Sequence, residues 1–195
     1  MSKKRWGWAE QEQERSRRAR VASESVLPCM SIRQPWAWAI ASGCKPVENR
    51  TWLPPGGLLG RRIGIAATAK APRPEEVEEL RRICLDVPRN YVLGSIVAVA
   101  TLVGAKRLDK DYSPSGYVGD PEKIAAWDRE HAGTWEIWAT GPVCWLLSEV
   151  FELPKPVPCK GMIGIWDLPS AELSEVQAQS PPASTVPRLF IVKGR

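Results

Sequence analysis

The chain has 195 residues, a hydrophobic share of 44% and a formal net charge of +5. This length predicts one domain with extensions or two small domains, and the hydrophobic share can supply a core. The sequence has no apolar run near the roughly 20 residues of a membrane helix, and its N-terminus lacks the apolar stretch of a signal peptide. We therefore expect a soluble, cytoplasmic protein that does not bind a membrane.

Positive charge is concentrated in one part of the chain. Residues 26–74 carry seven Lys or Arg residues against Glu48 alone, whereas residues 75–169 carry ten basic and fifteen acidic groups. This asymmetry favours a polyanionic partner, nucleic acid before membrane. A charged face that is simply solvated is the alternative interpretation.

The cysteine pattern argues against a metal site. No C-x-x-C pair is present, and His131 is the single histidine. We therefore expect no structural zinc, no other metal and no cofactor. Reduced thiols in a cytoplasmic protein fit an odd number of widely spaced cysteines best. The five are Cys29, Cys44, Cys84, Cys144 and Cys159.

The first half of the chain predicts alternating short elements. Residues 1–24 are charged without an apolar stripe and form a frayed helix or a flexible arm. Residues 27–32 read as a buried strand, and a short helix then runs from Pro35 to the stop at Gly43. Strands follow at residues 47–52 and 61–70. The second of these has a face nearly free of bulk, which allows close approach of a ligand or tight packing; its members are Gly64, Ala66, Thr68 and Lys70.

The second half predicts two more helices among strands. Residues 73–86 form a helix with Pro74 near its first position, and residues 92–104 are apolar on both faces, as in a central strand. Residues 105–119 look like a polar loop, Asp120 opens a second helix that Gly133 ends, and residues 143–153 and 161–168 form the last strands. From residue 170 the composition indicates a Ser/Pro-rich linker and a short tail, LFIV (189–192), that docks on the core or on a partner.

One segment, SIRQPWAWAIASGCKPVENRTW (31–52), combines tryptophans with charges. The two-residue period of a strand places Glu48, Arg50 and Trp52 on one side, with Lys45 at the mouth of this row. Neighbouring cations keep a carboxylate ionised, and the free N–H groups at the start of the preceding helix suit a phosphate. An exposed strand face with a weak ion pair is the alternative.

This segment resembles the signature of the ASCH domain family, named for its homology to the activating signal cointegrator. The family's G-x-K-x-x-E-x-R step is present as Gly43, Lys45, Glu48 and Arg50. The segments IAATAKAPRPEE, LGSIVAVATLV, GPVCWLL and LPKPVPCKGMIGIWDL also resemble family members. The resemblance covers the domain that we place at residues 25–169, so the arm (1–24) and the region 170–195 lie outside it.

The resemblance implies a fold and a partner. The fold is α+β, a small PUA-like β-barrel, mixed and largely antiparallel, with flanking short helices. The partner is RNA or DNA, with RNA favoured, read as a single strand or a flipped base. Lys45 and Arg50 would contact phosphate or base, and Glu48 would orient them or accept from a base amino group. The expected nucleic-acid-binding residues are Arg33, Gln34, Trp36, Trp38, Lys45, Glu48, Arg50, Trp52, Thr68, Lys70 and Lys160.

Two other functions stay open. Some small bacterial ASCH-like proteins are amidohydrolases that deacetylate N4-acetylcytidine with the same lysine, a threonine three residues on and a distant glutamate. Here Glu48 replaces that threonine, and Glu149 matches the glutamate by residue type only. Other members cut RNA, and Lys45 and Glu48 would be the catalytic groups of a metal-independent hydrolase. In the third interpretation, the arm and tail recruit a protein partner. We interpret His131 as structural.

Overall fold

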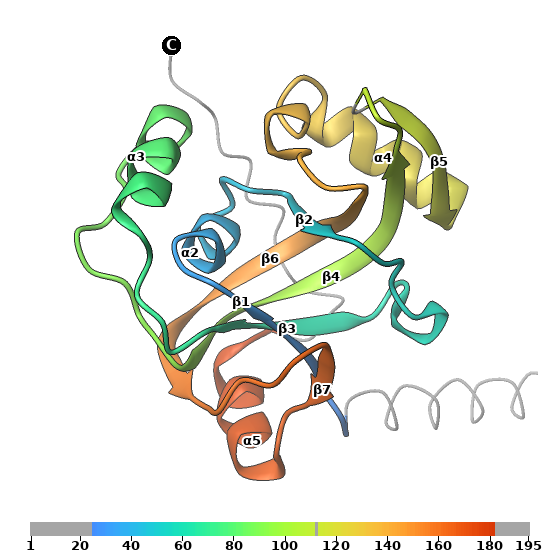
Figure 1. Cartoon of the computed structure of the whole chain (residues 1–195). Helices are drawn as coiled ribbons and strands as arrows, with labels where there is room; N and C mark the ends of the chain where they lie inside the picture. Colours follow the sequence, from blue (N-terminus) through green and yellow to red (C-terminus); the bar gives the residue numbers. More distant parts are fainter. Residues whose placement is uncertain (1–24, 112, 182–195) are drawn as a thin grey trace, which may run out of the picture.

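A seven-stranded mixed sheet forms the centre of the structure (Figure 1). The computed structural model describes residues 25–111 and 113–181. The predicted N-terminal arm and the LFIV tail lie outside the described residues. None of the helices within the described ranges has the length and apolar character needed to cross a membrane.

The sheet has the strand order β2-β6-β4-β3-β1-β7, and β5 pairs with β4. Its strands are β1 (Pro28–Ile32), β2 (Val47–Arg50), β3 (Arg62–Ala67), β4 (Ser95–Leu108), β5 (Pro114–Gly119), β6 (Val143–Pro158) and β7 (Ile165–Asp167). The helices are α2 (Trp36–Ala41), α3 (Pro74–Ile83), α4 (Pro121–His131) and α5 (Ser170–Gln179), with short 3-10 turns η1 (Gly56–Leu58) and η2 (Glu136–Trp138).

The predicted fold class is confirmed, but the barrel is not. Among the described strands, β1 and β3 alone pair in parallel, and the other strand pairs are antiparallel. Strands β2 and β7 end the strand order, and no pairing joins them within the described ranges. The architecture is therefore a mixed α+β fold around an open sheet.

The central strand β4 is buried along most of its length, as its two apolar faces predict. Ala98 and Leu102 pack in the core cluster beneath α2, whereas Val99 packs with Trp166 on the α5 side of the sheet. The face of β3 that carries mostly small residues is used for packing between strands in the structure. A Cβ added at Gly64 would stand 2.5 Å from the sulfur of Cys29, so the two parallel strands leave no room for a ligand.

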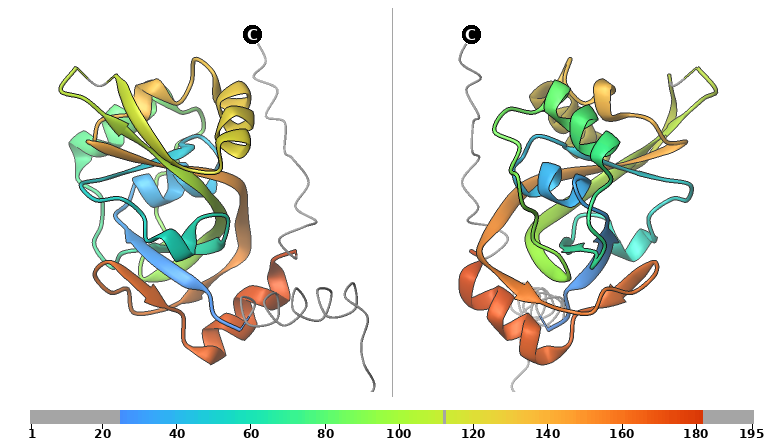
Figure 2. Two further views of the ribbon diagram at one scale, coloured as in Figure 1. Left: turned by 90° about the vertical axis from the view of Figure 1, so that its right-hand side faces the viewer. Right: turned by 60° about the vertical axis from the view of Figure 1, so that its left-hand side comes forward.

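Residues 105–108 and 114–119 pair as the two strands of a β-hairpin, so the prediction of a polar loop over residues 105–119 is wrong for them. β4 continues to Leu108 and pairs with β5, and the hairpin projects from the body of the molecule (Figure 2). The Asp109 carboxylate accepts from the backbone N–H groups of Asp111 and Ser113 and so fixes the turn. The exposed strand β5 has little apolar surface to bury, which is why its sequence resembles a loop.

Residues 170–179 form α5, so the linker predicted from residue 170 is wrong for this segment. The helix packs against β6 and β7 at the lower end of the molecule (Figures 1 and 2). Leu173 and Val176, three residues apart, are its buried residues. Two buried residues in a Ser- and Ala-rich stretch give only a weak helical period in the sequence. The composition by itself therefore suggests a linker.

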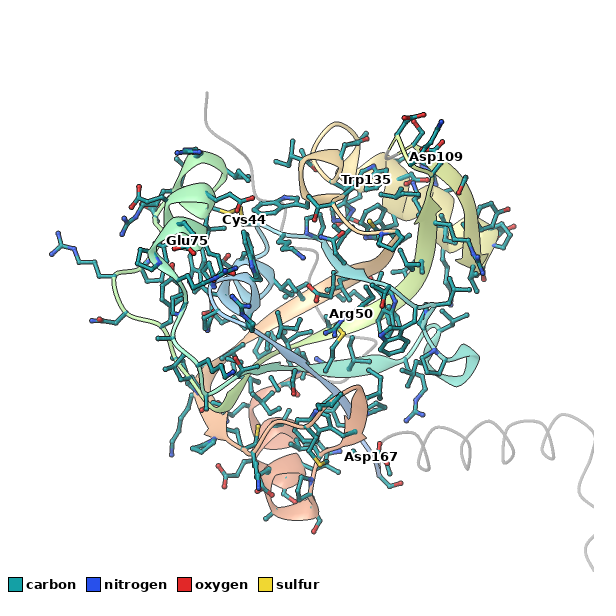
Figure 3. The ribbon with its side chains drawn as sticks, viewed as in Figure 1. Cys44, Arg50, Glu75, Asp109, Trp135 and Asp167 are labelled. Atoms are coloured by element: carbon teal, nitrogen blue, oxygen red, sulfur yellow. A yellow bond between two sulfur atoms is a disulfide. The ribbon has the colours of Figure 1, made fainter. Side chains whose placement is uncertain are left out.

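Cys44 and Cys84 form a disulfide, with 6.2 Å between their Cα atoms (Figure 3). The expectation of reduced thiols is therefore wrong for this pair, and the cytoplasmic location stays a prediction. Cys29, Cys144 and Cys159 are free. Burial raises the pKa of the Cys29 thiol to about 12 and that of Cys144 to about 11, so both stay neutral at pH 7. Forty residues separate the bonded pair, and only the packing of α3 beside α2 brings them together.

We predict that Cys84→Ser, or reduction of the wild-type chain, lowers the free energy of unfolding by about 2–4 kcal/mol, because the cross-link restricts the unfolded chain. Guanidinium unfolding with and without dithiothreitol measures this. Cys159→Ser, which removes a free thiol, is the control and should keep the wild-type response to reductant. Equal midpoints for oxidised and reduced wild type would contradict the prediction.

Candidate functional site

The end of α2 and the start of β2 set the position of Lys45. Gly43 adopts a left-handed φ of 75°, and its N–H donates to the Ile40 carbonyl at 2.9 Å. The chain then turns back, and the Lys45 N–H donates to the Ala39 carbonyl at 2.8 Å. The helix stop at Gly43 is therefore confirmed, although α2 begins at Trp36 rather than Pro35.

Lys45, Glu48 and Arg50 form an ion cluster, as the strand period predicts. The Lys45 ammonium lies 3.0 Å from Glu48 Oε2, and Arg50 Nε lies 3.3 Å from Glu48 Oε1. Lys45 also donates to the Val47 carbonyl, and Arg50 Nη2 donates to the Ser31 carbonyl at 3.1 Å. One carboxylate thus stands between two cations. We call these three residues the KER cluster.

The KER cluster is mostly buried, and its accessible side is that of Arg50. The side chains of Lys45, Glu48 and Arg50 are 5%, 12% and 21% exposed. Lys45 therefore lies behind Glu48 rather than at the mouth of the row. Figure 3 shows Arg50 near the centre of the molecule, between α2 and α4. A partly buried cluster with one cation in excess can receive an anionic group on the Arg50 side.

The segment after β6 packs beside the KER cluster. The Ser31 hydroxyl donates to the Met162 carbonyl at 2.8 Å, and Trp166 Nε1 donates to the Ser31 oxygen at 3.2 Å. A Cβ at Gly161 would stand 2.7 Å from the Ser31 hydroxyl, so glycine permits this approach. Because the Ser31 carbonyl also accepts from Arg50, the backbone at Gly161 and Met162 lies close to the cluster.

Asn49, between the two cluster residues of β2, faces the other way and holds the segment before β6. Its Nδ2 donates to the Trp138 carbonyl at 2.7 Å, and its Oδ1 accepts from the N–H groups of Thr140 and Gly141. The sequence analysis missed this residue. An Asn inside a strand, where it is disfavoured, was the available signal.

The tryptophans near the motif are only partly exposed, which limits the ring surface on which a base could stack. Trp52 is 37% exposed, and its ring meets Trp145 edge-on at 4.7 Å. Trp36, predicted to bind nucleic acid, is half-buried and meets Trp138 edge-on at 6.4 Å. Trp38, predicted to do the same, is half-buried against the core cluster that contains Leu80. Trp52 therefore offers the most open aromatic face of the three.

Gln34 and Arg33 are engaged in structural contacts. Gln34 is 1% exposed; its Nε2 donates to the Val92 carbonyl at 2.8 Å, and its Oε1 accepts from the Trp38 N–H at 2.9 Å. Arg33 pairs with Glu76 on α3. Glu76 also accepts from the Arg73 side chain at 2.9 Å. Arg73, then the backbone of Arg73 and the Arg33 guanidinium hold the pKa of Glu76 down to about 2, against the opposing effect of burial.

The remaining predicted site residues stand apart from the KER cluster. Thr68 is half-buried, and its hydroxyl has no hydrogen-bond partner. Lys70 and Lys160 are exposed. Among the described residues, no hydrogen bond or ion pair joins these three to the cluster.

A separate hollow, which we call the α4–β6 cleft, has a volume of about 700 Å³ and is lined by Lys45 but not by Glu48 or Arg50. Glu149 lines the same cleft, with a left-handed φ of 48° that is strained for a residue other than glycine. Its Oε2 accepts from the Thr101 hydroxyl at 2.8 Å. His131 stacks on Trp127 at 4.4 Å at the cleft's edge, which agrees with a structural histidine.

These features define a small α+β domain with a cationic cluster between α2 and β2, and comparison with known proteins identifies it. The ASCH domain matches residues 30–143, so the chain belongs to the ASCH domain family. Over 82 residues it is 37% identical to human activating signal cointegrator 1 and 35% identical to the mouse protein. Each match covers 38% of this chain and spans only 14% of the relative. A crystal structure of ASCH from Zymomonas mobilis is similar, with 18% identity, a TM-score of 0.42 and coverage of 80% of this chain and 95% of that chain.

We predict that Glu48→Gln lowers the free energy of unfolding by about 3–5 kcal/mol, because it leaves two largely buried cations without their carboxylate. Urea unfolding measures the loss. Glu152→Gln removes an exposed carboxylate elsewhere and should stay within about 0.5 kcal/mol of wild type. Equal losses in both variants would show that the KER cluster does not stabilise the fold.

We predict that Glu76 makes stability depend on acid. Its pKa is lowered from 4.5 to about 2, so its contribution is present above pH 4.5 and is lost as the pH falls toward 2. Glu76→Gln should destabilise at pH 6 by about 1.5–3 kcal/mol and differ less from wild type at pH 2.5. Urea midpoints measured across this range test the trend, with Glu79→Gln, an exposed carboxylate on the same helix, as control. A constant difference between wild type and Glu76→Gln would contradict it.

Proposed function

We propose that this chain is a nucleic-acid-binding ASCH module that favours RNA over DNA and reads a single strand or a flipped base at the KER cluster. The observation that supports this proposal is the carboxylate of Glu48 held between two cations, with Arg50 as the most accessible of the three. The preference for RNA rests on the resemblance to PUA-like domains, which commonly bind RNA.

The charge of the KER cluster favours an anionic or polar ligand. Two cations and one carboxylate leave a net charge of +1 in a largely buried site. A phosphate oxygen or a base acceptor near Arg50 would gain charge-assisted hydrogen bonds that are about twice as strong as neutral ones. Glu48 would accept from a base amino group, as carboxylates do in base recognition.

The contacts of the two cations support different tasks for them. Lys45 is tied to Glu48 and to the Val47 carbonyl, so it orients the carboxylate rather than reaching the ligand. Arg50 is anchored through Ser31 and meets the ligand directly. Trp52 supplies an exposed ring on which a base can stack, worth about 1–3 kcal/mol. Lys160 and Lys70 add exposed cations for the backbone phosphates.

We predict that Arg50→Met raises the Kd for single-stranded RNA about tenfold or more, the size expected for one lost bidentate contact. Lys160→Met should leave the fold unchanged and lower the slope of log Kd against log salt by about 1. Fluorescence anisotropy of labelled single- and double-stranded RNA and DNA, across a salt series with the full chain, measures both.

The matched control is Arg107→Met, which removes the same charge from the exposed face of β4. Equal effects of Arg50→Met and Arg107→Met would mean that net charge, not the KER cluster, binds the nucleic acid. The oligonucleotides are recovered and sized afterwards, because a shortened product would indicate a ribonuclease instead. Circular dichroism of each variant separates lost binding from lost folding.

One observation favours a hydrolase as the second candidate. Lys45 and Glu149 line the same cleft, so a lysine and a glutamate distant in sequence meet around one hollow, as in the N4-acetylcytidine amidohydrolases that the family resemblance suggests. Glu149 would act as the general base and Lys45 would stabilise the developing negative charge. Release of acetate from N4-acetylcytidine, abolished by Glu149→Gln, would favour this function over binding alone.

A further inference from the structure

The α4–β6 cleft carries a charge opposite to that of the KER cluster. The carboxylates of Glu130, Glu149 and Glu152 line it. Among the described lining residues, Lys123 is the lysine that is not paired with Glu48, and Arg62, at the rim, carries its charge near Glu149. An acidic lining repels a phosphate backbone and attracts a basic segment. A polyanion is therefore a poor occupant of this cleft.

The cleft also offers apolar surface and a free strand edge. Val150 and Phe151 are partly exposed along its wall. Strand β2 pairs with β6 only over Val143–Leu146 of β6, and no described strand continues that pairing beyond Leu147. The backbone N–H and C=O groups along this edge can pair with an extended segment. Farther along β6, the Lys155 N–H donates to the Gln179 side-chain oxygen, so the stretch of unpaired strand edge is short.

The chain leaves the described structure at the rim of this cleft. The Pro181 carbonyl accepts a hydrogen bond from Arg62, which lies opposite Thr101 in the β3–β4 pair. The Thr101 hydroxyl in turn binds Glu149 inside the cleft. Fourteen residues follow Pro181 in the sequence, a reach of about 46 Å when extended. That length is ample to cross a cleft that begins beside its first residue.

The sequence of residues 182–195 complements the cleft. It is PASTVPRLFIVKGR, with Arg188, Lys193 and Arg195 and no acidic residue. Its LFIV run is apolar and rich in residues that favour strands. Basic groups on both sides of an apolar run match carboxylates on both sides of an apolar wall.

We infer that residues 182–195 of the same chain occupy the α4–β6 cleft, with LFIV against Val150 and Phe151 and the basic residues toward the carboxylates. A tethered segment has an effective concentration in the millimolar range, which favours it over a free partner. Docked there, the segment covers the cleft side of Lys45 and leaves the Arg50 side open. The inference does not depend on nucleic-acid binding.

Photo-crosslinking of the full chain tests this inference. Phe190 is replaced by p-benzoylphenylalanine, the chain is irradiated at low micromolar concentration, and the monomer is digested for mass spectrometry. Crosslinks to residues 123–131 or 147–152 of the same molecule are expected. A double charge reversal in the cleft, Glu130→Lys with Glu152→Lys, should reduce their yield several-fold, and so should high salt.

The matched control reverses two exposed carboxylates outside the cleft, Glu79→Lys with Glu136→Lys, and should keep the wild-type yield. Crosslinks scattered over the surface, or unchanged by the cleft reversal, would overturn the inference. Crosslinked dimers joined through the cleft would overturn the intramolecular assignment and show that a second copy supplies the segment. Irradiation of a chain labelled at Leu85, an exposed residue on the α3 side, gives the background pattern.

Discussion

The carboxylate of Glu48 holds the side chains that connect two parts of the fold not joined to each other by strand pairing. β2 is a four-residue edge strand that pairs only with β6, yet its Arg50 reaches the carbonyl of Ser31 on β1. β1 stands four places away in the strand order, so the sheet must curl far enough to bring Arg50 of β2 to β1. Side-chain contacts join the two strands there, whereas in a closed barrel backbone hydrogen bonds between strands would do so. Glu48 keeps the two cations of this bridge together in a nearly dry interior.

The KER cluster and the α4–β6 cleft differ in charge. Two of the seven cations of residues 26–74, Lys45 and Arg50, meet at the KER cluster, whereas carboxylates from α4 and β6 line the α4–β6 cleft. Lys45 belongs to the cluster and also lines the cleft, but its charge is paired with Glu48. A single fold can in this way keep an anionic ligand and a basic peptide on separate surfaces.

Local signals in the sequence predicted the parts of the site that depend on local geometry. Pro35 and Gly43 bracket α2, and the two-residue period puts Glu48 and Arg50 side by side, because these features need only neighbouring residues. Burial of Lys45 could not be predicted, since its long side chain turns away from the mouth toward Glu48. The family resemblance added the expected partner but implied a closed barrel that the strand pairing does not form.

Features that depend on tertiary contacts escaped the sequence analysis. The Cys44–Cys84 disulfide requires α3 to pack beside α2, and the spacing of the cysteines in the sequence does not predict it. α5 is held by two buried residues, Leu173 and Val176, which are too few to raise a periodic signal. Glu149 meets Lys45 at one cleft only because β6 bulges where Glu149 takes its left-handed conformation. Each miss concerns an element whose partner lies far along the chain.

Asn49, which lies inside the family motif, has a structural role separate from that of the KER cluster. Its side chain replaces backbone partners for the segment that enters β6: it binds Trp138, Thr140 and Gly141, and Cys144 also donates to it at 3.3 Å. Gly141 packs so closely that a Cβ there would stand 2.9 Å from Asn49 Cβ. The position between Glu and Arg in the motif is therefore not interchangeable in this chain. A library that randomises the motif should keep Asn49 and Gly141 together, because their close packing joins β2 to the segment that enters β6.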